Sequence, residues 1–249
     1  MMSDKNFHYP DWDAPNHIKS IQTYRSPGFS ADCYSSFNLS DTVGDSLEAV
    51  NKNLSLLSAS LPSSPYWLSQ VHDNQVVELP NNEQVLIADA SFTKEKGVVC
   101  AVRTADCLPL LLTDKKGTFV AAVHAGWRSL ASGIIENTLS QIKSNYGIIA
   151  WLGPSISQTY YEVGQEVYDT FTNFDGDSHS GFIKLPNNKY LLSMPQIALK
   201  KLKKNGVKKI FGAGVNESFC TYRDSHLFYS HRRDSDTGRM ATLIWIQGH

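Results

Sequence analysis

The chain has 249 residues, of which 41% are hydrophobic and 19% are charged, and this composition excludes an intrinsically disordered protein. With 24 acidic and 23 basic side chains the formal net charge is −1, so no overall field favours nucleic acid or an anionic membrane surface. We therefore expect a small molecule as partner and no nucleic acid. The one basic run is expected to be a solvated helix end and comprises Lys200, Lys201, Lys203, Lys204, Lys208 and Lys209.

The sequence favours a cytoplasmic location. Residues 1–15 are polar and acidic and lack the basic start and apolar run of a secretion signal. The longest apolar stretches, such as 97–102 and 108–112, are far too short to span a bilayer, so we expect no membrane association. The four cysteines lack dense, pairing-like spacing, which fits a reducing compartment where thiols stay free for metal binding or catalysis.

The predicted elements alternate irregularly between strands and helices. Short apolar, β-branched runs predict strands over 18–24, 66–71, 75–79, 97–103, 108–113, 118–124, 148–152, 209–212 and 240–246. Capping boxes at Asp45…Glu48 and Ser193…Gln196, a helical spacing of apolar residues over 130–142 and a segment over 165–174 predict helices. This order predicts an α/β (α+β) fold with mixed sheets covered by helices. Because no repeat, low-complexity tract or long linker interrupts the chain, residues 1–249 are expected to form a single domain.

Three candidate metal ligands lie at the ends of predicted strands between Ser69 and Trp127. They are His72, Cys107 and His124. Catalytic zinc is commonly held by three imidazole or thiolate ligands and keeps one open position, which two histidines and one cysteine would satisfy. An open position would allow the metal to acidify water or to polarise a substrate oxygen. The sequence therefore suggests a catalytic zinc centre.

Taken singly, these residues have structural interpretations. A histidine at the end of an apolar strand, such as His124, is commonly a hydrogen-bonded core residue, and the same holds for His72. Cys107 would be a buried small hydrophobe, as Cys100 is expected to be. The ligands are far apart in sequence and no short motif such as C-x-x-C or H-E-x-x-H supports them. The three residues indicate a metal site only when they are considered together.

The candidate ligands belong to a series of short blocks that extends along nearly the whole chain. The blocks are Ser36-Phe37-Asn38-Leu39, Val43-Gly44-Asp45, Trp67-Leu68-Ser69-Gln70-Val71-His72, Ala88-Asp89-Ala90, Thr104-Ala105-Asp106-Cys107-Leu108-Pro109, Val123-His124-Ala125-Gly126-Trp127-Arg128, Leu152-Gly153-Pro154-Ser155-Ile156, Tyr161-Glu162-Val163-Gly164, Arg232-Arg233-Asp234 and Thr237-Gly238-Arg239-Met240. In sequence and order they resemble the blocks of the multicopper-polyphenol-oxidase-like, or laccase-domain, family, whose members are also described as YfiH-type, purine nucleoside phosphorylase or peptidoglycan editing factor proteins. Several blocks in the same order make a chance match improbable.

The resemblance implies that His72, Cys107 and His124 are zinc ligands. It also implies a four-layer α/β/β/α sandwich similar to the catalytic domain of the cytotoxic necrotizing factor toxins. The chain departs from the family near its start, where a Thr-Thr-Arg-x-Gly-Gly run is replaced by residues 23–28, Thr-Tyr-Arg-Ser-Pro-Gly. Proline restricts its own φ and the residue before it, so the loop that carries Arg25 is expected to differ in shape.

Proteins similar to this chain are credited with phosphorolysis of adenosine, inosine and methylthioadenosine, with deamination of adenosine, with polyphenol oxidation and with editing of peptidoglycan precursors. Multicopper oxidation needs many imidazoles, usually in His-x-His pairs, and this chain has eight histidines and no such pair. Copper bound at the His-Cys-His set would give a weak oxidase side reaction at most. We therefore expect a zinc-dependent purine nucleoside phosphorylase with accompanying adenosine deaminase activity, a monomer or small homo-oligomer that binds a purine nucleoside and phosphate.

Several polar residues are candidates for substrate contacts. Arg25 is the predicted phosphate ligand, with Arg128 and Arg233 as others, because guanidinium groups match phosphate geometry. For the last two, a surface or interstrand ion pair is an equal alternative. Asn38 and Gln70 are expected to bind ribose hydroxyls or base edges. Asp89 is expected to be catalytic, as an acid, a base or the orienter of a ligand histidine.

Two alternatives to the phosphorylase remain open. In the first, the protein hydrolyses an amide bond in a cell-wall precursor, with zinc-activated water or the Cys107 thiolate as nucleophile and His124 as base. A cysteine that ligates a metal is unavailable as a nucleophile, so the mechanisms compete for Cys107. In the second, the zinc is structural and the protein is a partner-binding module without catalytic activity.

Overall fold

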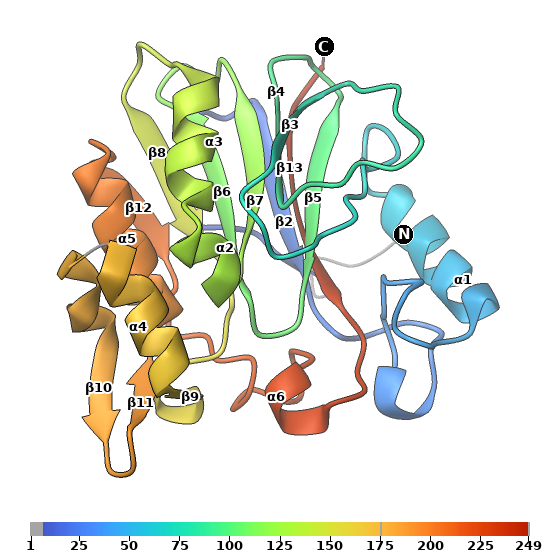
Figure 1. Ribbon diagram of the computed structural model, residues 1–249. Helices are drawn as coiled ribbons and strands as arrows, with labels where there is room; N and C mark the ends of the chain where they lie inside the picture. Colours follow the sequence, from blue (N-terminus) through green and yellow to red (C-terminus); the bar gives the residue numbers. More distant parts are fainter. Residues whose placement is uncertain (1–6, 175, 249) are drawn as a thin grey trace.

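Two β-sheets pack face to face at the centre of the molecule (Figure 1). The computed structural model describes residues 7–174 and 176–248. The larger sheet has the order β12 (Lys209–Gly212), β8 (Ile148–Leu152), β6 (Leu108–Asp114), β7 (Val120–Ala125), β4 (Ala90–Thr93), β3 (Val76–Leu79). The smaller sheet has the order β1 (Phe7–His8), β2 (Ile18–Thr23), β13 (Met240–Ile246), β5 (Val99–Thr104). A separate hairpin and strand form the sheet β10 (Phe182–Leu185), β11 (Lys189–Leu192), β9 (Glu162–Gly164).

The strand pairing within the larger sheet is mixed, as predicted. β12 runs parallel to β8 and β3 runs parallel to β4, whereas β6, β7, β8 and β4 pair in antiparallel fashion. The paired strands of the smaller sheet are all antiparallel. β6 and β7 form the middle of the larger sheet, and every residue of both strands is buried. These strands are therefore continuous apolar runs, because both of their faces are covered.

Helices cover the outer face of the larger sheet. Alternate residues of β6 show the arrangement: Leu110 and Leu112 contact the helices, whereas Leu111 packs into the core between the two sheets. The α-helices of the described chain, on both sides of the molecule, are α1 (Leu47–Ser58), α2 (Trp127–Ala131), α3 (Ile134–Ile142), α4 (Gln165–Phe174), α5 (Met194–Lys204) and α6 (His231–Asp234). The apolar faces of α2, α3, α4 and α5 belong to the core cluster on this side.

The outer face of the smaller sheet is covered differently. Here Leu57 of α1 packs with Phe37 and Leu39 of an irregular segment against Ile21 and Leu243 of the sheet. The predicted mixed α+β class is thus confirmed. The stricter four-layer order stays a prediction, because this outermost layer consists of one helix and irregular chain. The likeness to the toxin domain also stays a prediction.

The predicted strands are confirmed except for one. The segment 66–71 is extended chain with isolated bridges at Tyr66 and Ser69, so the strand predicted there was wrong. The sequence patterns missed β1, β4, β9, β10 and β11, which are two to four residues long. A strand of this length displays little of a period of two, so only short strands with a clear apolar run, such as β3 and β12, were predicted.

Two helix predictions need correction. The first helix is capped by Ser46, whose Oγ accepts the N–H of Ala49, and not by Asp45. Asp45 instead accepts hydrogen bonds from Ser30 Oγ and the Ser46 N–H. The helix predicted over 130–142 is divided into α2 and α3, because Gly133 adopts φ +89°, a left-handed conformation that ends the first helix. Ser193 caps its helix as predicted, since its Oγ accepts the N–H of Gln196. The reciprocal half of the capping box is not formed, because the Ser193 N–H donates to the Gly181 carbonyl.

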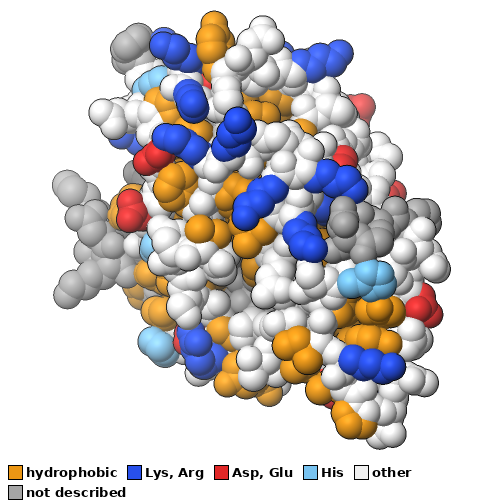
Figure 2. All heavy atoms as spheres, turned by 90° about the vertical axis from the view of Figure 1, so that its left-hand side faces the viewer, with side chains coloured by type: hydrophobic (Ala, Val, Ile, Leu, Met, Phe, Trp, Pro, Cys, Tyr) orange, Lys and Arg blue, Asp and Glu red, His pale blue; other side chains and the backbone are white. Residues whose placement is uncertain are grey.

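The lysine run lies at the end of α5 and beyond it. Lys201 departs from the expected solvated face: it is buried and its Nζ lies 2.6 Å from Glu136 Oε1. Figure 2 shows the face that includes α5, where lysine and arginine side chains are separated by hydrophobic and uncharged ones. Among residues 7–174 and 176–248, no helix has both the length and the apolar character needed to cross a bilayer.

Candidate metal centre

The three predicted metal ligands converge at one end of the larger sheet. Pairing of Leu108 with Ala125 and of Pro109 with His124 places Cys107 beside His124, and the loop that carries His72 joins them. The candidate ligand atoms of the three residues all lie within 4.8 Å of one another. Cys107 Sγ lies 3.7 Å from His72 Nε2, and the two imidazole rings are 4.8 Å apart between centroids.

The separation of one ligand pair, Cys107 and His72, matches the spacing around a zinc ion. Zn–N bonds of about 2.1 Å and Zn–S bonds of about 2.3 Å in a tetrahedral arrangement place two ligand atoms about 3.5 Å apart. The Sγ–Nε2 separation of 3.7 Å agrees with this value. Gly126 also keeps the space open, since a Cβ at this position would lie 3.0 Å from Cys107 Sγ and 2.9 Å from His72 Cδ2. The chain therefore brings two imidazoles and a thiol together where one soft or borderline cation can be held.

Asp89 fixes two of the three ligands. Its fully buried carboxylate accepts a hydrogen bond from His124 Nδ1 at 2.7 Å, which leaves Nε2 of that ring free to bind a metal. The same carboxylate accepts the backbone N–H groups of Val71, His72 and Asp73 at 3.2, 3.0 and 2.8 Å. Burial raises the pKa of Asp89, but these hydrogen bonds and the charge of His124 outweigh burial and hold the pKa below its ordinary value. Asp89 thus orients the candidate ligand His124 through Nδ1.

Cys107 and His124 shift each other's pKa in opposite directions. Burial raises the pKa of the Cys107 thiol, but the charge and hydrogen bonds of His124 and His72 lower it to about 6. Burial lowers the pKa of His124, but the Cys107 thiolate and Asp89 raise it to about 9. Near neutral pH the cysteine is therefore a thiolate, which is the form that binds metals and attacks electrophiles.

The backbone beside two of the ligands is held in an uncommon conformation. His72 adopts φ +63°, and Asp106, which precedes Cys107, adopts φ +89°. Non-glycine residues in the left-handed region are stable only where surrounding contacts hold them. The Asp89 carboxylate holds His72 by accepting its N–H. The Asp106 carboxylate accepts hydrogen bonds from Thr221 Oγ1 and the Arg232 N–H, both at 2.6 Å, and these bonds hold Asp106. The ligand segments are thus rigidly tied to their neighbours.

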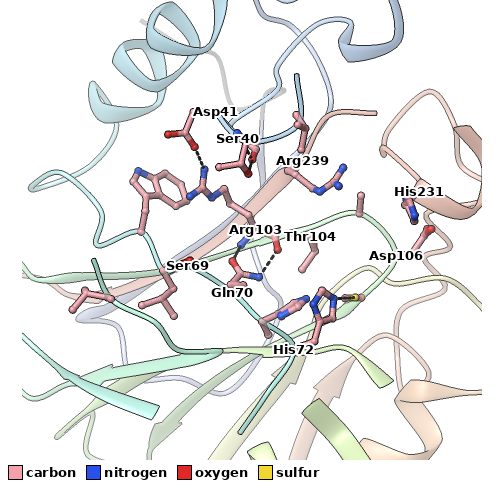
Figure 3. A pocket seen from close by; sticks show the side chains of 18 of the residues that line it. Ser40, Asp41, Ser69, Gln70, His72, Arg103, Thr104, Asp106, His231 and Arg239 are labelled. Carbon is pink, nitrogen blue, oxygen red and sulfur yellow. Dashed lines mark hydrogen bonds and ion pairs between the residues drawn. The ribbon is translucent and has the colours of Figure 1, made fainter. Parts of the chain in front are cut away.

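The three ligands line a cavity of about 1150 Å³ (Figure 3). Trp127, Tyr161 and Met194 give its wall an apolar part near the ligands. Burial raises the pKa of Tyr161 well above its ordinary range, so its hydroxyl stays protonated. The cavity is also rich in cations, since four arginines line it: Arg103, Arg128, Arg232 and Arg239. Such a lining favours a substrate with an aromatic base and an anionic group.

Two of the residues predicted to contact substrate line this cavity. Gln70 lines the cavity, although both ends of its amide bind the backbone of Arg103. Gln70 Nε2 donates to the Arg103 carbonyl, and Gln70 Oε1 accepts the Arg103 N–H, both at 2.8 Å. Arg128 does as well, with its guanidinium 4.3 Å from the centroid of the Trp127 ring. Figure 3 shows Gln70 between Arg103 and His72.

The other predicted substrate residues do not line the cavity. The Arg25 guanidinium donates to the backbone carbonyls of Ser35 and Ser225, and Asn38 is fully buried with its amide bonded within the protein. Arg233 donates to the carbonyls of Thr221, Tyr222 and Phe228 and pairs with Asp234. These three side chains hold loops in place, so the structure gives them no contact with a cavity-bound substrate.

Sequence reasoning missed several cavity residues, namely Arg103, Thr104, Tyr161, Arg232 and Arg239. Each of them except Arg103 belongs to one of the blocks that carry the family resemblance. Arg103 directly precedes the block that begins at Thr104. Position within or beside these blocks was therefore a usable signal.

Comparisons with known proteins show which family the chain resembles. The family model described as multi-copper polyphenol oxidoreductase laccase matches residues 19–247. The "Purine nucleoside phosphorylase YfiH" of Escherichia coli is 42% identical over 241 residues, which cover 95% of this chain and 97% of that protein. A "Purine nucleoside phosphorylase" of Haemophilus influenzae is 40% identical over 243 residues, which cover 96% of this chain and 98% of that protein.

Solved structures show the same fold. A protein of Neisseria meningitidis has a TM-score of 0.90 and 40% identity, with 98% of this chain and 100% of that chain covered. A hypothetical protein YfiH of Bacillus licheniformis has a TM-score of 0.85 and 25% identity, with 93% and 94% covered. The resemblance read from the sequence blocks is confirmed, and the chain belongs to the multi-copper polyphenol oxidoreductase laccase family, in its YfiH-type branch.

Proposed function

We propose that this protein is a zinc-dependent purine nucleoside phosphorylase that uses phosphate to cleave adenosine, inosine and methylthioadenosine. The observation that carries the proposal is one cavity that combines the His72, Cys107 and His124 triad with arginines that no carboxylate neutralises. Within the described chain, no carboxylate forms an ion pair with Arg128, Arg232 or Arg239. The names of the relatives, which are 40–42% identical along nearly their whole length, support it.

His72, Cys107 and His124 would hold the zinc, and Asp89 would keep His124 in the tautomer that binds through Nε2. A bound zinc ion supplies Lewis-acid polarisation of a substrate atom. The arginines would hold phosphate, which attacks the anomeric carbon while the bond to the purine nitrogen breaks and its electron pair leaves with the base. Trp127 and Tyr161 would contact the purine and exclude water, and the Tyr161 hydroxyl would remain a neutral donor. The products are pentose 1-phosphate and the free base.

Adenosine deamination is proposed as an accompanying activity of the same cavity. A metal held by His72, Cys107 and His124 would supply activation of water for attack on the amino-bearing carbon of the purine, the chemistry that zinc deaminases use. This reaction consumes water and releases ammonia, whereas phosphorolysis consumes phosphate. The two activities therefore separate by their dependence on phosphate.

One observation favours a second function, hydrolysis of an amide in a cell-wall precursor. Without a metal, Cys107, His124 and Asp89 form a thiolate, imidazole and carboxylate series, with Nδ1 of the histidine 2.7 Å from the carboxylate. This order of groups is the one used by cysteine hydrolases. Because the same thiolate is a proposed zinc ligand, metal content decides between the two functions.

Polyphenol oxidation is proposed only as a weak side reaction with bound copper. The chain has eight histidines, and among its described residues one cluster of three or more histidine, cysteine or acidic side chains has ligating geometry. Several coppers need several such clusters. The description of the family model as a laccase therefore reflects the family and not the number of metal sites in this chain.

The decisive experiment incubates the zinc-loaded protein with inosine or adenosine, with and without phosphate, and follows free base, pentose 1-phosphate and ammonia. We expect base and pentose 1-phosphate only with phosphate, and loss of turnover and of bound zinc in Cys107→Ala. Cys33→Ala is the matched control, since Cys33 is exposed and lies outside the cavity. Equal activity of Cys107→Ala and wild type would refute the site. Cleavage of a muramyl peptide by metal-free protein, without nucleoside cleavage, would establish the amidohydrolase instead.

A further inference from the structure

Arg239 is a half-buried cavity arginine with unused hydrogen-bond donors. It lies directly before β13, and its Nη1 donates to the carbonyls of Thr237 and Gly238 at 2.7 and 3.1 Å. Nε and Nη2 have no hydrogen-bond partner in the part of the chain that the structure describes, and no carboxylate pairs with this guanidinium there. Burial lowers the pKa of Arg239, which shows that its charge is partly desolvated, although the Cys107 thiolate and Asp106 counteract this effect.

The other cavity arginines are engaged differently. Arg103 pairs with Asp41 at 3.0 Å, and its guanidinium lies 4.9 Å from the Trp67 ring centroid. Arg128 and Arg232 are exposed, and each lies over an aromatic ring, at 4.3 and 4.8 Å from the centroid. Arg239 is half-buried and covers no ring within the described chain. A partly desolvated cation with free N–H donors is a stronger anion ligand than an exposed one.

The backbone of Arg239 is held on both sides. Its N–H donates to Asn38 Oδ1 at 2.9 Å, and its carbonyl accepts the N–H of Leu39 at 3.2 Å. Asn38 is in turn fixed, because its Nδ2 donates to Ser40 O and to Asp45 Oδ2, both at 2.9 Å. Asn38, predicted as a substrate contact, is therefore placed to act on substrate through Arg239. A fixed backbone lowers the entropy lost when the guanidinium binds a ligand.

Thr104 supplies an independent observation. It pairs with Met240, the residue after Arg239, and it lines the same cavity. The residue is 2% exposed, and its hydroxyl has no hydrogen-bond partner in the described structure. A buried hydroxyl without a partner is destabilising unless a ligand or water satisfies it. In Figure 3 Thr104 lies between Arg239 and His72, so a ligand here would reach toward the metal centre.

We propose that Arg239 and Thr104 form the subsite for the phosphate co-substrate, with Asn38 as the positioning residue of Arg239. This proposal rests on the proposed function. A tetrahedral oxyanion would accept two N–H bonds from the guanidinium edge that faces away from the Thr237 carbonyl and one O–H bond from the threonine. The same chemistry would accept the phosphate group of a nucleotide, so inorganic phosphate and a nucleoside monophosphate must be compared.

The test measures phosphate binding to the zinc-loaded protein by calorimetry, and KM for phosphate and for inosine separately. Arg239→Lys keeps the positive charge but loses the paired N–H donors of the guanidinium group. Both Arg239→Lys and Arg239→Met should reduce the affinity for phosphate roughly 10- to 100-fold. KM for inosine should change little. Thr104→Val should weaken phosphate about 2- to 10-fold and leave the folded protein at least as stable, since no protein hydrogen bond is lost. Arg223→Met, outside the cavity, is the control for loss of an arginine.

The outcomes separate this subsite from the proposed function. Wild-type protein that does not bind phosphate, or Arg239 variants that bind it within threefold of wild type, would overturn the subsite. Tighter binding of inosine 5′-monophosphate than of phosphate, lost in Arg239→Met, would assign the subsite to a phosphate ester and also overturn it. Phosphate binding that depends on Arg239, without formation of pentose 1-phosphate, would support the subsite and refute the phosphorylase.

Discussion

Replacement of Asp89 by asparagine tests how strongly one carboxylate supports the metal centre. One oxygen of Asp89 accepts the N–H of His72 and Nδ1 of His124, and the other accepts the N–H groups of Val71 and Asp73. Asparagine has the same shape but offers an NH₂ donor in place of one oxygen. In either orientation of the amide, two of the four hydrogen bonds are lost, because the asparagine NH₂ group then faces two N–H donors of the protein.

The size of the effect follows from these contacts. Hydrogen bonds to a charged group contribute about 1.5–3 kcal/mol each, so loss of two lowers the free energy of unfolding by about 3–6 kcal/mol. One amide orientation releases the loop that carries His72, and the other disturbs the tautomer of His124. Loss of such a supporting contact typically weakens metal binding about 10- to 100-fold. Asp89→Asn should therefore show both effects.

The assay measures zinc affinity by competition with a chelator and the free energy of unfolding by urea titration. Asp114→Asn is the matched control, because Asp114 is also fully buried and accepts hydrogen bonds from Lys116, Thr118 and Ser144. Asp114 is at the far end of β6 from Cys107, roughly 20 Å along the strand. The control should lose stability and keep its zinc affinity. Equal zinc affinity in Asp89→Asn and Asp114→Asn would refute the role given to Asp89.

Four further predictions concern the site and the core. Gly126→Ala places a methyl group 3.0 Å from Cys107 Sγ and should weaken zinc at least tenfold in the same competition assay, with little change in the far-ultraviolet circular dichroism. In metal-free protein that also carries Cys33→Ser, the rate at which iodoacetamide alkylates Cys107 should increase with pH around a midpoint of about 6, the pKa of the Cys107 thiol, and not around 9, the ordinary value. Bound zinc should protect Cys107 from alkylation. In metal-free protein, attraction between the Cys107 thiolate and the His124 imidazolium stabilises the fold between about pH 6 and about pH 9. Below about pH 6 the thiolate is protonated, and above about pH 9 the imidazolium loses its proton. The urea concentration at the midpoint of unfolding should therefore decrease on both sides of this pH range. Leu111→Ala, fully buried between the sheets, should lower the free energy of unfolding by about 2–5 kcal/mol, and a loss under 1 kcal/mol would contradict the packing described.

The sequence predicted most of the central strands because their residues are buried on both faces and form long apolar runs, as in β6 and β13. It missed β4, a fully buried strand of four residues, because Ser91 and Thr93 interrupt its apolar pattern. The metal triad was predictable from residue chemistry and family blocks together. The roles of Arg25 and Asn38 were not, because a hydrogen bond to a backbone carbonyl far along the chain, such as that from Arg25 to Ser225, leaves no local pattern.

The place of β13 in the smaller sheet has a consequence for synthesis on the ribosome. β13 lies between β2 and β5 and pairs with both, yet it follows β5 by more than 130 residues in the sequence. At about 5–20 residues per second, a ribosome needs on the order of ten seconds between the two strands. During that interval β2 and β5 have no partner on their inner edges, and Ile21 and Ala101 lack the residue that covers them, Leu243. Nascent chains halted before β13 should therefore aggregate or recruit chaperones, whereas chains released after it should not.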